Sequence, residues 1–531
     1  MILINKVPLT FLSFESFLSV NLKHSISCET NVEGSYKLPI LAQLNNQEQQ
    51  FVISFLKSSG SIKKMSHNCR NTVQNYNLSI MKNLLSFALI LNAFLSFNQE
   101  FEGHWTGKIV VQGFPLTLDY HISKSENGFT ATMDSPDQKS FGNKVKEIIV
   151  NGNEINLNFP EYKIFTKLNY KNDSLTGIYT QYGKNYPLSL SRKTGEYKGI
   201  NRPQEPKAPF DYQIEEVKFK NTKDQITLAG TFTYPNGDGP FPTVILISGS
   251  GGQNRNEELF NHKPFWVIAD YFAKNGIATL RYDDRGIDNS EGIFATSTSE
   301  DFAEDAKAGV DFLKTHPKVN ASKLGIVGHS EGGMIAPMIS ASDSSIGFII
   351  LLAGPGIPID ELMTLQNIEV SKAAGLAESM IKENAALNQK CYAIIKTEKD
   401  LAKTKSKLKK LLSKNKMSEL DIQNTINLIC SPWFRYFMKY EPKISLEKLK
   451  CPVLAINGDK DIQVTAKENL AGIEAALKKA GNQNYEVKLV ENKNHLFQTT
   501  QKLGIDEYFE NEETFAPDVL KLMLDWINKI E

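Results

Sequence analysis

The chain has 531 residues, with 60 basic and 60 acidic side chains, a formal net charge of zero and 41% hydrophobic residues. This length predicts two or more domains, and the composition is that of an ordinary globular protein. The balanced charge lacks the basic surplus of a nucleic-acid-binding protein, so no nucleic-acid partner is predicted. The five cysteines form no CxxC pattern and no cluster with histidine, so neither a disulfide framework nor a zinc site is predicted.

The apolar segment from Leu84 to Phe97 has the anatomy of a secretory signal peptide. It follows the short basic start Met81-Lys82-Asn83 and carries no charge. It is too short to span a bilayer comfortably, so no stable membrane span is predicted. We interpret residues 81–98 as a signal peptide, residues 1–80 as an extension upstream of the true start, and the protein as exported to the periplasm or the medium. A helix buried in the core is the alternative.

Residues 101–195 predict a small antiparallel β barrel or sandwich. Ile155 to Phe159 alternates apolar and polar residues, which is the period of a half-buried strand, and turn signals separate such runs. The most distinctive stretches here are His104-Trp105 and Asp134 to Gln138. We interpret them as core and turn residues, with contact to a ligand as the alternative.

The remainder of the chain predicts an α/β fold, after a polar segment with three prolines, 196–212, that is predicted to be an extended linker. From about 213 to 531, strands that are apolar on both faces alternate with helical patterns. This alternation predicts a mainly parallel sheet covered by helices on both sides. The predicted strands are 243–247, 277–280, 324–327, 348–352, 453–456 and 487–490. An insertion at about 357–442, rich in Lys, Leu, Glu and Ala, is interpreted as a helical cap.

The pentapeptide Gly328-His329-Ser330-Glu331-Gly332 is the strongest chemical signal in the chain. It matches G-x-S-x-G, a pattern short enough to arise by chance. Here it follows an apolar strand and opens into a helical pattern, and strand–turn–helix is the setting of a nucleophile elbow. We predict Ser330 as the nucleophile, at a helix N-terminus that favours negative charge.

A serine needs a base to become a good nucleophile, and that base needs an acid to orient it. In a fold with such an elbow, the acid and then the base follow the serine along the chain. His495 is the only histidine after Ser330, and it follows the last predicted strand, so we predict it as the base. The preceding strand ends in Asp459 and Asp461. We predict Asp461 as the acid because it lies further into the loop, with Asp459 as a turn residue.

Hydrolysis also needs two backbone N–H groups that hold the developing oxyanion. One is predicted at Glu331, directly after the nucleophile. The other is predicted in the loop Ser248 to Gly252, whose glycines let the backbone approach a substrate. Ser250 is the preferred donor, with Gly249 or Gly251 as alternatives. This loop does not match a phosphate-binding loop, because no Gly-Lys-Ser/Thr follows it.

Together these motifs resemble the EstD-type bacterial esterases of the α/β-hydrolase superfamily, near its serine aminopeptidase S33 and dienelactone-hydrolase-like branches. Two further motifs support the resemblance, Arg281 to Gly286 and Asn494 to Gln498. The resemblance runs over about 213–531, and residues 101–195 are similar to the small β domain of some exported members. It implies an α/β-hydrolase fold and ester hydrolysis with no metal and no organic cofactor. Ile287 to Ser290 departs from the pattern, because relatives tend to have a glycine there.

We therefore predict a serine hydrolase that cleaves carboxylic esters in a small-molecule or acylated substrate, through an acyl-enzyme on Ser330. The first alternative is an S33-type peptidase that uses the same triad on an amide. The aromatic residues of the insertion form either the wall of a substrate pocket or the core of the insertion. They include Trp433, Phe434, Tyr436 and Phe437. The second alternative is a non-catalytic binder of carbohydrate or lipid that uses the β domain.

Overall fold

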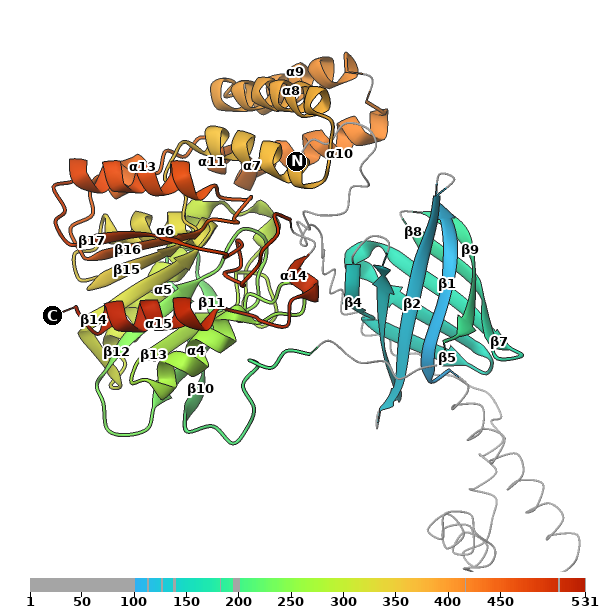
Figure 1. Ribbon diagram of the computed structural model, residues 1–531, viewed down its shortest axis with the longest axis horizontal. Helices are drawn as coiled ribbons and strands as arrows, with labels where there is room; N and C mark the ends of the chain where they lie inside the picture. Colours follow the sequence, from blue (N-terminus) through green and yellow to red (C-terminus); the bar gives the residue numbers. More distant parts are fainter. Residues whose placement is uncertain are drawn as a thin grey trace, which may run out of the picture. The chain divides into compact units, whose positions relative to one another are not determined.

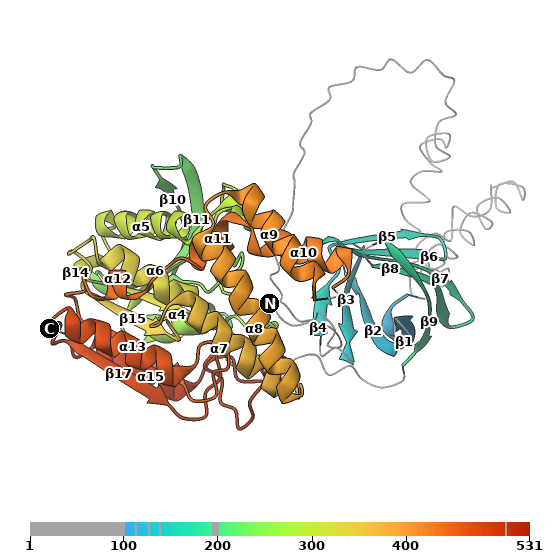
Figure 2. The same cartoon turned by 90° about the horizontal axis from the view of Figure 1, so that it is seen from above.

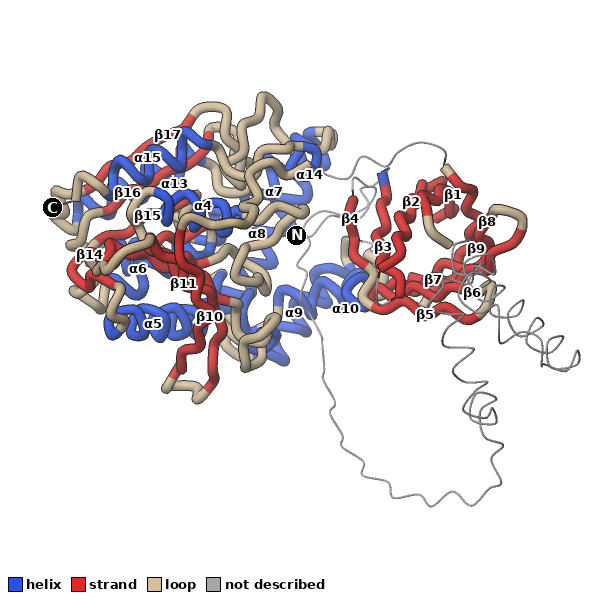
Figure 3. The backbone as a smooth tube through the Cα atoms, turned by 90° about the horizontal axis from the view of Figure 1, so that it is seen from below, coloured by secondary structure: helices blue, strands red, loops and turns tan. Residues whose placement is uncertain are grey.

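The computed structural model describes residues 101–111, 114–125, 128–136, 140–181, 183–193, 201–415, 417–504 and 507–530. The predicted upstream extension and signal peptide, residues 1–98, lie outside the described residues. The chain divides into two compact units, with the boundary between Gly195 and Glu196. Figure 1 shows both units, and Figure 3 shows that the first consists mainly of strands while the second mixes strands and helices.

The first unit is an antiparallel sheet whose strands are neighbours in the order β4-β3-β2-β1-β9-β8-β7-β6-β5. Its strands are β1 (Gly103–Val111), β2 (Phe114–Ser125), β3 (Gly128–Ser135), β4 (Ser140–Lys144), β5 (Glu147–Asn151), β6 (Glu154–Phe159), β7 (Ile164–Lys171), β8 (Ser174–Gln181) and β9 (Lys184–Arg192). Between β4 and β5, Val145 N–H donates to the Ala131 carbonyl of β3 and Lys146 N–H donates to the Asn158 carbonyl of β6, both at 3.0 Å. This stretch joins the two ends of the sheet, so the sheet curls around an apolar core. We call it the β unit.

Trp105 and Asp134, from the two distinctive stretches of the β unit, both lie buried. Trp105 is fully buried in the apolar core, and its indole Nε1 donates to the Phe101 carbonyl at 2.8 Å. Asp134 lies near the end of β3 with 6% exposure, and its Oδ1 accepts a hydrogen bond from Gly142 N at 2.6 Å. Both are therefore held within the β unit itself.

The second unit contains an eight-stranded sheet in the order β10-β11-β13-β12-β14-β15-β16-β17. Its strands are β10 (Tyr212–Asn221), β11 (Ile226–Pro235), β12 (Phe241–Ile247), β13 (Ala278–Tyr282), β14 (Val319–His329), β15 (Phe348–Leu352), β16 (Val453–Gly458) and β17 (Tyr485–Val490). The pairs from β13 to β17 are parallel, whereas β10 and β11, and β11 and β13, pair antiparallel. We call this the α/β unit.

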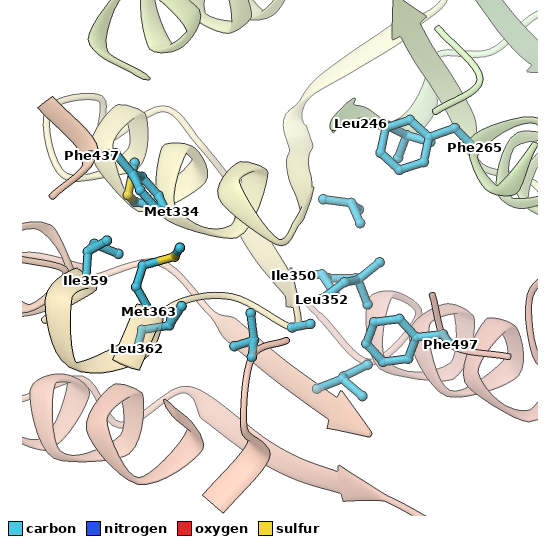
Figure 4. Close-up of a cluster of buried hydrophobic side chains, with 14 of the residues drawn as sticks. Leu246, Phe265, Met334, Ile350, Leu352, Ile359, Leu362, Met363, Phe437 and Phe497 are labelled. Carbon is cyan, nitrogen blue, oxygen red and sulfur yellow. The ribbon is translucent and has the colours of Figure 1, made fainter. Parts of the chain in front are cut away.

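Helices cover both faces of this sheet because its central strands, such as β13, β15 and β16, are buried on both sides. One face packs on α4 (Pro264–Lys274) and α15 (Pro517–Ile527), and the other on α5 (Ser299–Thr315), α6 (Glu331–Ser340) and α13 (Ala466–Lys479). Alternate residues of β15 show this division, since Ile350 belongs to the first core and Ile349 to the second. Figure 4 shows part of the first core around Ile350 and Leu352. A short helix, α14 (Glu507–Glu510), precedes α15.

A helical insertion lies in the chain between β15 and β16. It consists of α7 (Ile359–Ala373), α8 (Glu378–Thr397), α9 (Leu401–Ser413), α10 (Glu419–Ile429), α11 (Pro432–Phe437) and α12 (Lys443–Leu446). Most of these helices gather on one side of the α/β unit (Figure 2). Three of the four aromatic residues predicted to line a pocket or fill a core, Trp433, Phe434 and Phe437, are at most 6% exposed and belong to a hydrophobic core shared with the sheet. Their packing is therefore that of core residues.

The segment predicted to be a linker is anchored where it is described. Arg202 donates to the carbonyls of Phe260, Asn261 and Asn511 at 2.9 to 3.2 Å, and Gln204 donates to the Phe515 carbonyl at 2.7 Å. Glu205 adds an ion pair with Lys263. Residues 202–205 therefore belong to the surface of the α/β unit, because their side chains satisfy backbone groups that are distant in sequence.

Candidate active site

Ser330 lies in a strained turn between β14 and α6. Its backbone has φ 53° and ψ −114°, a conformation that costs a residue with a side chain about 1–3 kcal/mol. A Cβ atom on Gly328 would lie 2.1 Å from the Gly332 carbonyl oxygen, and one on Gly332 would lie 2.1 Å from the Ile247 carbonyl oxygen. Only glycine fits at these two places. The G-x-S-x-G spacing therefore follows from the close contact of β12, β14 and α6, and the turn is a nucleophile elbow.

Asp461 and His495 are in direct contact at the ends of neighbouring strands. Asp461 follows β16 and His495 follows β17, and Asp461 Oδ2 lies 2.8 Å from His495 Nδ1. The other oxygen, Oδ1, accepts hydrogen bonds from the amides of Gln463 at 2.8 Å and Val464 at 2.9 Å. Asp461 and His495 are each 5% exposed. The ring is thus fixed through Nδ1, which leaves Nε2 as the nitrogen available for chemistry.

Asp459 does not take this position. One of its carboxylate oxygens pairs with Lys460 Nζ at 2.8 Å, and its amide donates to the Val490 carbonyl at 3.0 Å. Of the two aspartates after β16, Asp461 is the one that contacts His495.

The loop that carries His495 is held by its own side chains. Asn494 Oδ1 accepts hydrogen bonds from the amides of Leu496 and Gln498, both at 3.0 Å. Asn494 Nδ2 donates to Gln498 Oε1 at 2.9 Å. The motif from Asn494 to Gln498 thus forms a closed turn around His495, a role that the local sequence does not reveal.

The glycine-rich loop after β12 lies beside Ser330. A Cβ on Gly249 would come within 3.2 Å of Ser330 Cβ. The Gly249 amide, however, donates to Glu257 Oε1 at 2.6 Å, so Gly249 is ruled out as an oxyanion donor in this conformation. The Ser250 amide has no hydrogen-bond partner within the described part of the chain. The Glu331 amide opens α6 and has no acceptor within its own helix. Glu331 and Ser250 thus remain available as donors, with Gly251 still an alternative to Ser250 because its amide also has no partner in the described ranges.

Two consecutive aspartates shape this loop from the neighbouring strand. Asp283 pairs with Arg255 through Oδ2 at 2.7 Å and accepts from the Arg255 amide at 2.8 Å. Asp284 Oδ2 accepts from the Gln253 amide at 2.8 Å. Burial raises the pKa of Asp284 well above its usual range. The Arg281 to Gly286 motif therefore holds the glycine-rich loop in place, and none of its described contacts involves Ser330 or His495.

The departure at Ile287 to Ser290 is accommodated without a glycine. Asp288 adopts a left-handed φ of 42°, and Ser290 Oγ donates to the Asp283 carbonyl at 2.7 Å. Asp283 thus receives support from both loops, and this turn does not disturb the contacts near Ser330.

The side chain of Glu331 joins the elbow to the helical insertion. Its carboxylate accepts from Ser299 Oγ at 2.6 Å and from Trp433 Nε1 at 2.9 and 3.1 Å. The side chain is buried, with 3% exposure of the residue. Burial raises the pKa of this carboxyl to about 7, against the opposing effect of the two hydrogen bonds. Sequence reasoning singled out the Glu331 backbone and missed this side chain, because Trp433 lies 102 residues away.

Ser330 itself is half-buried, and its Oγ makes no hydrogen bond within the described residues. Hydrogen bonds to a catalytic serine are often long without substrate and tighten when substrate binds. No group of three or more His, Cys, Asp or Glu residues in the described ranges could hold a metal ion. None of the described helices has the length and apolar character needed to cross a membrane.

Comparison with known proteins agrees with this arrangement. The family model described as serine aminopeptidase, S33, matches residues 264–500. Esterase EstD of Thermotoga maritima is 28% identical over 270 residues, which are 51% of this chain and 58% of EstD. The chain thus matches a little over half the length of that relative. The thiohydrolase apmlB of Arthrinium phaeospermum is 28% identical over 149 residues, 27% of this chain and 44% of that protein.

A solved structure of an esterase from Pyrococcus furiosus, PF2001, aligns with 63% of this chain and 99% of its own, at 18% identity and a TM-score of 0.39. The residues matched by the family model include the elbow and the strands from β13 to β17. By its elbow geometry and its sequence matches, the α/β unit has the α/β-hydrolase fold and is similar to EstD and to the family described as serine aminopeptidase, S33.

Proposed function

We propose that this protein is a serine hydrolase that cleaves carboxylic esters, with Ser330, His495 and Asp461 as its catalytic triad. The observation that carries the proposal is the contact of Asp461 with His495 Nδ1. The His495 backbone carbonyl is in turn hydrogen-bonded to His329, the residue before the serine of the strained elbow. Asp461 receives two amide hydrogen bonds on its other oxygen, and these hold the carboxyl group in place against His495. An ionised aspartate at Nδ1 selects the tautomer of His495 that accepts a proton at Nε2.

In the proposed reaction, His495 Nε2 removes the proton from Ser330 Oγ as this oxygen attacks the acyl carbonyl. The amides of Ser250 and Glu331 hold the resulting oxyanion. His495 then donates the proton to the leaving alcohol as the C–O bond breaks, which leaves an acyl-enzyme. Water, deprotonated by His495, attacks the acyl carbon, and Ser330 leaves with the proton as the carboxylic acid is released.

The substrate is proposed to be a small-molecule or acylated ester, with its acyl or alcohol part bounded by the helical insertion. Trp433, a residue of the insertion, supports this view because its Nε1 donates a hydrogen bond to Glu331, the residue after the nucleophile. An S33-type peptidase is the second candidate, favoured by the family model that matches residues 264–500. The same three side chains would then act on an amide.

A substrate panel separates the two candidates. p-Nitrophenyl esters of increasing acyl length would be tested against aminoacyl p-nitroanilides, with Ser330→Ala as the blank. We expect turnover of esters with kcat/KM at least about a hundredfold above that of the anilides. Anilide turnover that equals or exceeds ester turnover would transfer the assignment to the peptidase.

Export is a further part of the proposal. It rests on the sequence alone, on the short basic start at Met81-Lys82 and the uncharged stretch Leu84 to Phe97. Protein isolated from its native host should begin near residues 97–100, as read by N-terminal sequencing. An intact chain that starts at Met1 in the soluble cytosolic fraction would refute both the signal peptide and the exported location.

A further inference from the structure

A second carboxylate–imidazole pair lies beside His495 of the proposed triad and takes no part in the chemistry described above. Glu257 and His329 are 1% and 5% exposed, and Glu257 Oε1 lies 2.8 Å from His329 Nδ1. Glu257 belongs to the loop after β12, and His329 directly precedes the nucleophile. Two ionisable groups buried together need a reason, because an apolar pair of the same size would be at least as stable.

Glu257 holds the glycine-rich loop Ser248 to Gly252, which we call the oxyanion loop. The oxygen that faces His329 also accepts the hydrogen bond from the Gly249 amide at 2.6 Å. Fixing this peptide sets the direction of the next one, which carries the proposed Ser250 donor. Glu257 itself adopts a left-handed φ of 49°, a strained conformation that its surroundings must hold in place.

His329 acts on the loop of the proposed base. Its Nε2 donates to the backbone carbonyl of His495 at 2.9 Å, and the two rings lie 4.8 Å apart between centroids. A carbonyl can only accept, so Nε2 carries a proton. Nδ1 faces a carboxylate oxygen that already accepts from an amide, so Nδ1 carries a proton as well. Burial lowers the pKa of His329, but the charge and hydrogen bond of Glu257 outweigh it and the net shift is upward.

We propose that Glu257 and His329 form a buried ion pair of positioning residues, which connects the oxyanion loop to the His495 loop through the residue next to Ser330. The chain of contacts runs from the Gly249 amide through Glu257 and His329 to the His495 carbonyl. Neither side chain touches substrate. The inference rests on the proposed function and extends it, since it explains how two loops from distant parts of the sequence keep one geometry.

The test uses two conservative variants in the full chain. Glu257→Gln keeps the shape and an acceptor for Gly249 but removes the charge. His329→Gln keeps a donor near the position of Nε2, whereas His329→Asn keeps one near Nδ1 only. We expect Glu257→Gln and His329→Asn to lower kcat at least about tenfold with KM within about threefold. The substrate still binds, but the oxyanion donor and His495 are no longer held in the positions that stabilise the transition state. His329→Gln should recover part of the kcat lost in His329→Asn.

The matched control is a second glutamate–histidine pair in the same unit, Glu215 and His316, whose atoms lie 3.5 Å apart. His316 lies just before the start of β14, at the opposite end of the strand from Ser330. Glu215→Gln should leave kcat within about twofold of the wild type. All rates are compared at a temperature where circular dichroism shows every variant folded.

The outcomes separate the inference from the function on which it rests. If Glu257→Gln and His329→Asn keep kcat within twofold while Ser330→Ala is inactive, the positioning role is wrong and the triad stands. The same conclusion follows if kcat falls only in proportion to the fraction of unfolded protein. If the wild type hydrolyses no ester or anilide, the proposed function itself fails.

Discussion

The β unit and the α/β unit each contain a buried histidine–aspartate pair, and the comparison shows what a catalytic pair requires. His121 Nε2 lies 2.8 Å from Asp134 Oδ2, and His495 Nδ1 lies 2.8 Å from Asp461 Oδ2. In each pair the other oxygen of the aspartate accepts a hydrogen bond from at least one backbone amide. Distance and burial therefore do not distinguish the two pairs.

The difference lies in the elements that carry them. His121 and Asp134 stand on adjacent antiparallel strands, β2 and β3, where regular pairing fixes both side chains. Asp461 and His495 stand on loops after the parallel strands β16 and β17. Loops at the carboxyl ends of parallel strands gather at one edge of a sheet, where the strained Ser330 also lies. Substitutions in the two pairs and at Ser330 therefore test whether this position at the carboxyl ends of parallel strands makes a histidine–aspartate pair catalytic.

Ser330→Ala should have the largest effect. We expect ester turnover to fall by a factor of at least about 10⁴, with the thermal midpoint nearly unchanged, because a half-buried elbow serine contributes little packing. Steady-state kinetics and a thermal melt of the same preparation check this. Activity within tenfold of the wild type would remove Ser330 from the role of nucleophile.

Asp461→Asn should lower kcat by about 10³ to 10⁴, because an asparagine no longer selects the reactive tautomer of His495. Asp459→Asn is the matched control and should stay within about threefold of the wild type, since Asp459 pairs with Lys460. The comparison is made by kcat at saturating ester. The reverse ranking would assign the orienting role to Asp459.

Glu331 should make the folded protein less stable as pH rises. Its pKa is raised to about 7 in the folded state, so the folded protein retains a proton that the unfolded chain releases near pH ~4.3. The free energy of unfolding should therefore decrease as pH rises from ~4.3 to ~7 and level off above pH ~7, with a total decrease of up to about 4 kcal/mol. Glu331→Gln keeps acceptors for Ser299 and Trp433 and should remove this slope.

Urea unfolding at several pH values measures that slope. Glu378→Gln is a control because this glutamate is exposed on the outside of the insertion, with 81% of its side chain accessible. It should leave the pH dependence as in the wild type. Parallel curves for the wild type and Glu331→Gln would show that the carboxyl of Glu331 titrates normally.

Asp134→Asn should have the smallest effect on catalysis. We expect kcat and KM within about twofold of the wild type, together with a loss of about 1–3 kcal/mol in the stability of the β unit, because a buried hydrogen-bonded carboxylate is replaced. Kinetics and urea unfolding followed by circular dichroism check both parts. A large loss of kcat would show that the two histidine–aspartate pairs do not differ in function as proposed.

The sequence predicts the parts of the site that depend on local order. The elbow follows from G-x-S-x-G between an apolar strand and a helix, and the structure gives Ser330 the strained backbone of such a turn. Chain order and loop position favour Asp461 over Asp459, and the contact with His495 agrees with that choice. The catalytic roles of these residues stay predictions until they are measured.

Contacts between distant residues could not be predicted in the same way. Glu257 and His329 are 72 residues apart, and Arg202 reaches a carbonyl 309 residues away. Composition alone predicts that a polar stretch with three prolines is a free linker, since it does not show which backbone groups such side chains will meet. Likewise, the sequence of the glycine-rich loop does not show that the Gly249 amide donates to Glu257, which excludes Gly249 as an oxyanion donor.

The most direct test of the account is a covalent label. The wild-type protein would be incubated with a p-nitrophenyl alkylphosphonate, which reacts with an activated serine and releases one p-nitrophenol for each site, and the adduct would be located by peptide mass spectrometry. The account predicts one adduct, on Ser330, absent in Ser330→Ala and formed at least about 10³-fold more slowly in His495→Gln. Labelling of another residue, or equal rates in the wild type and His495→Gln, would contradict it.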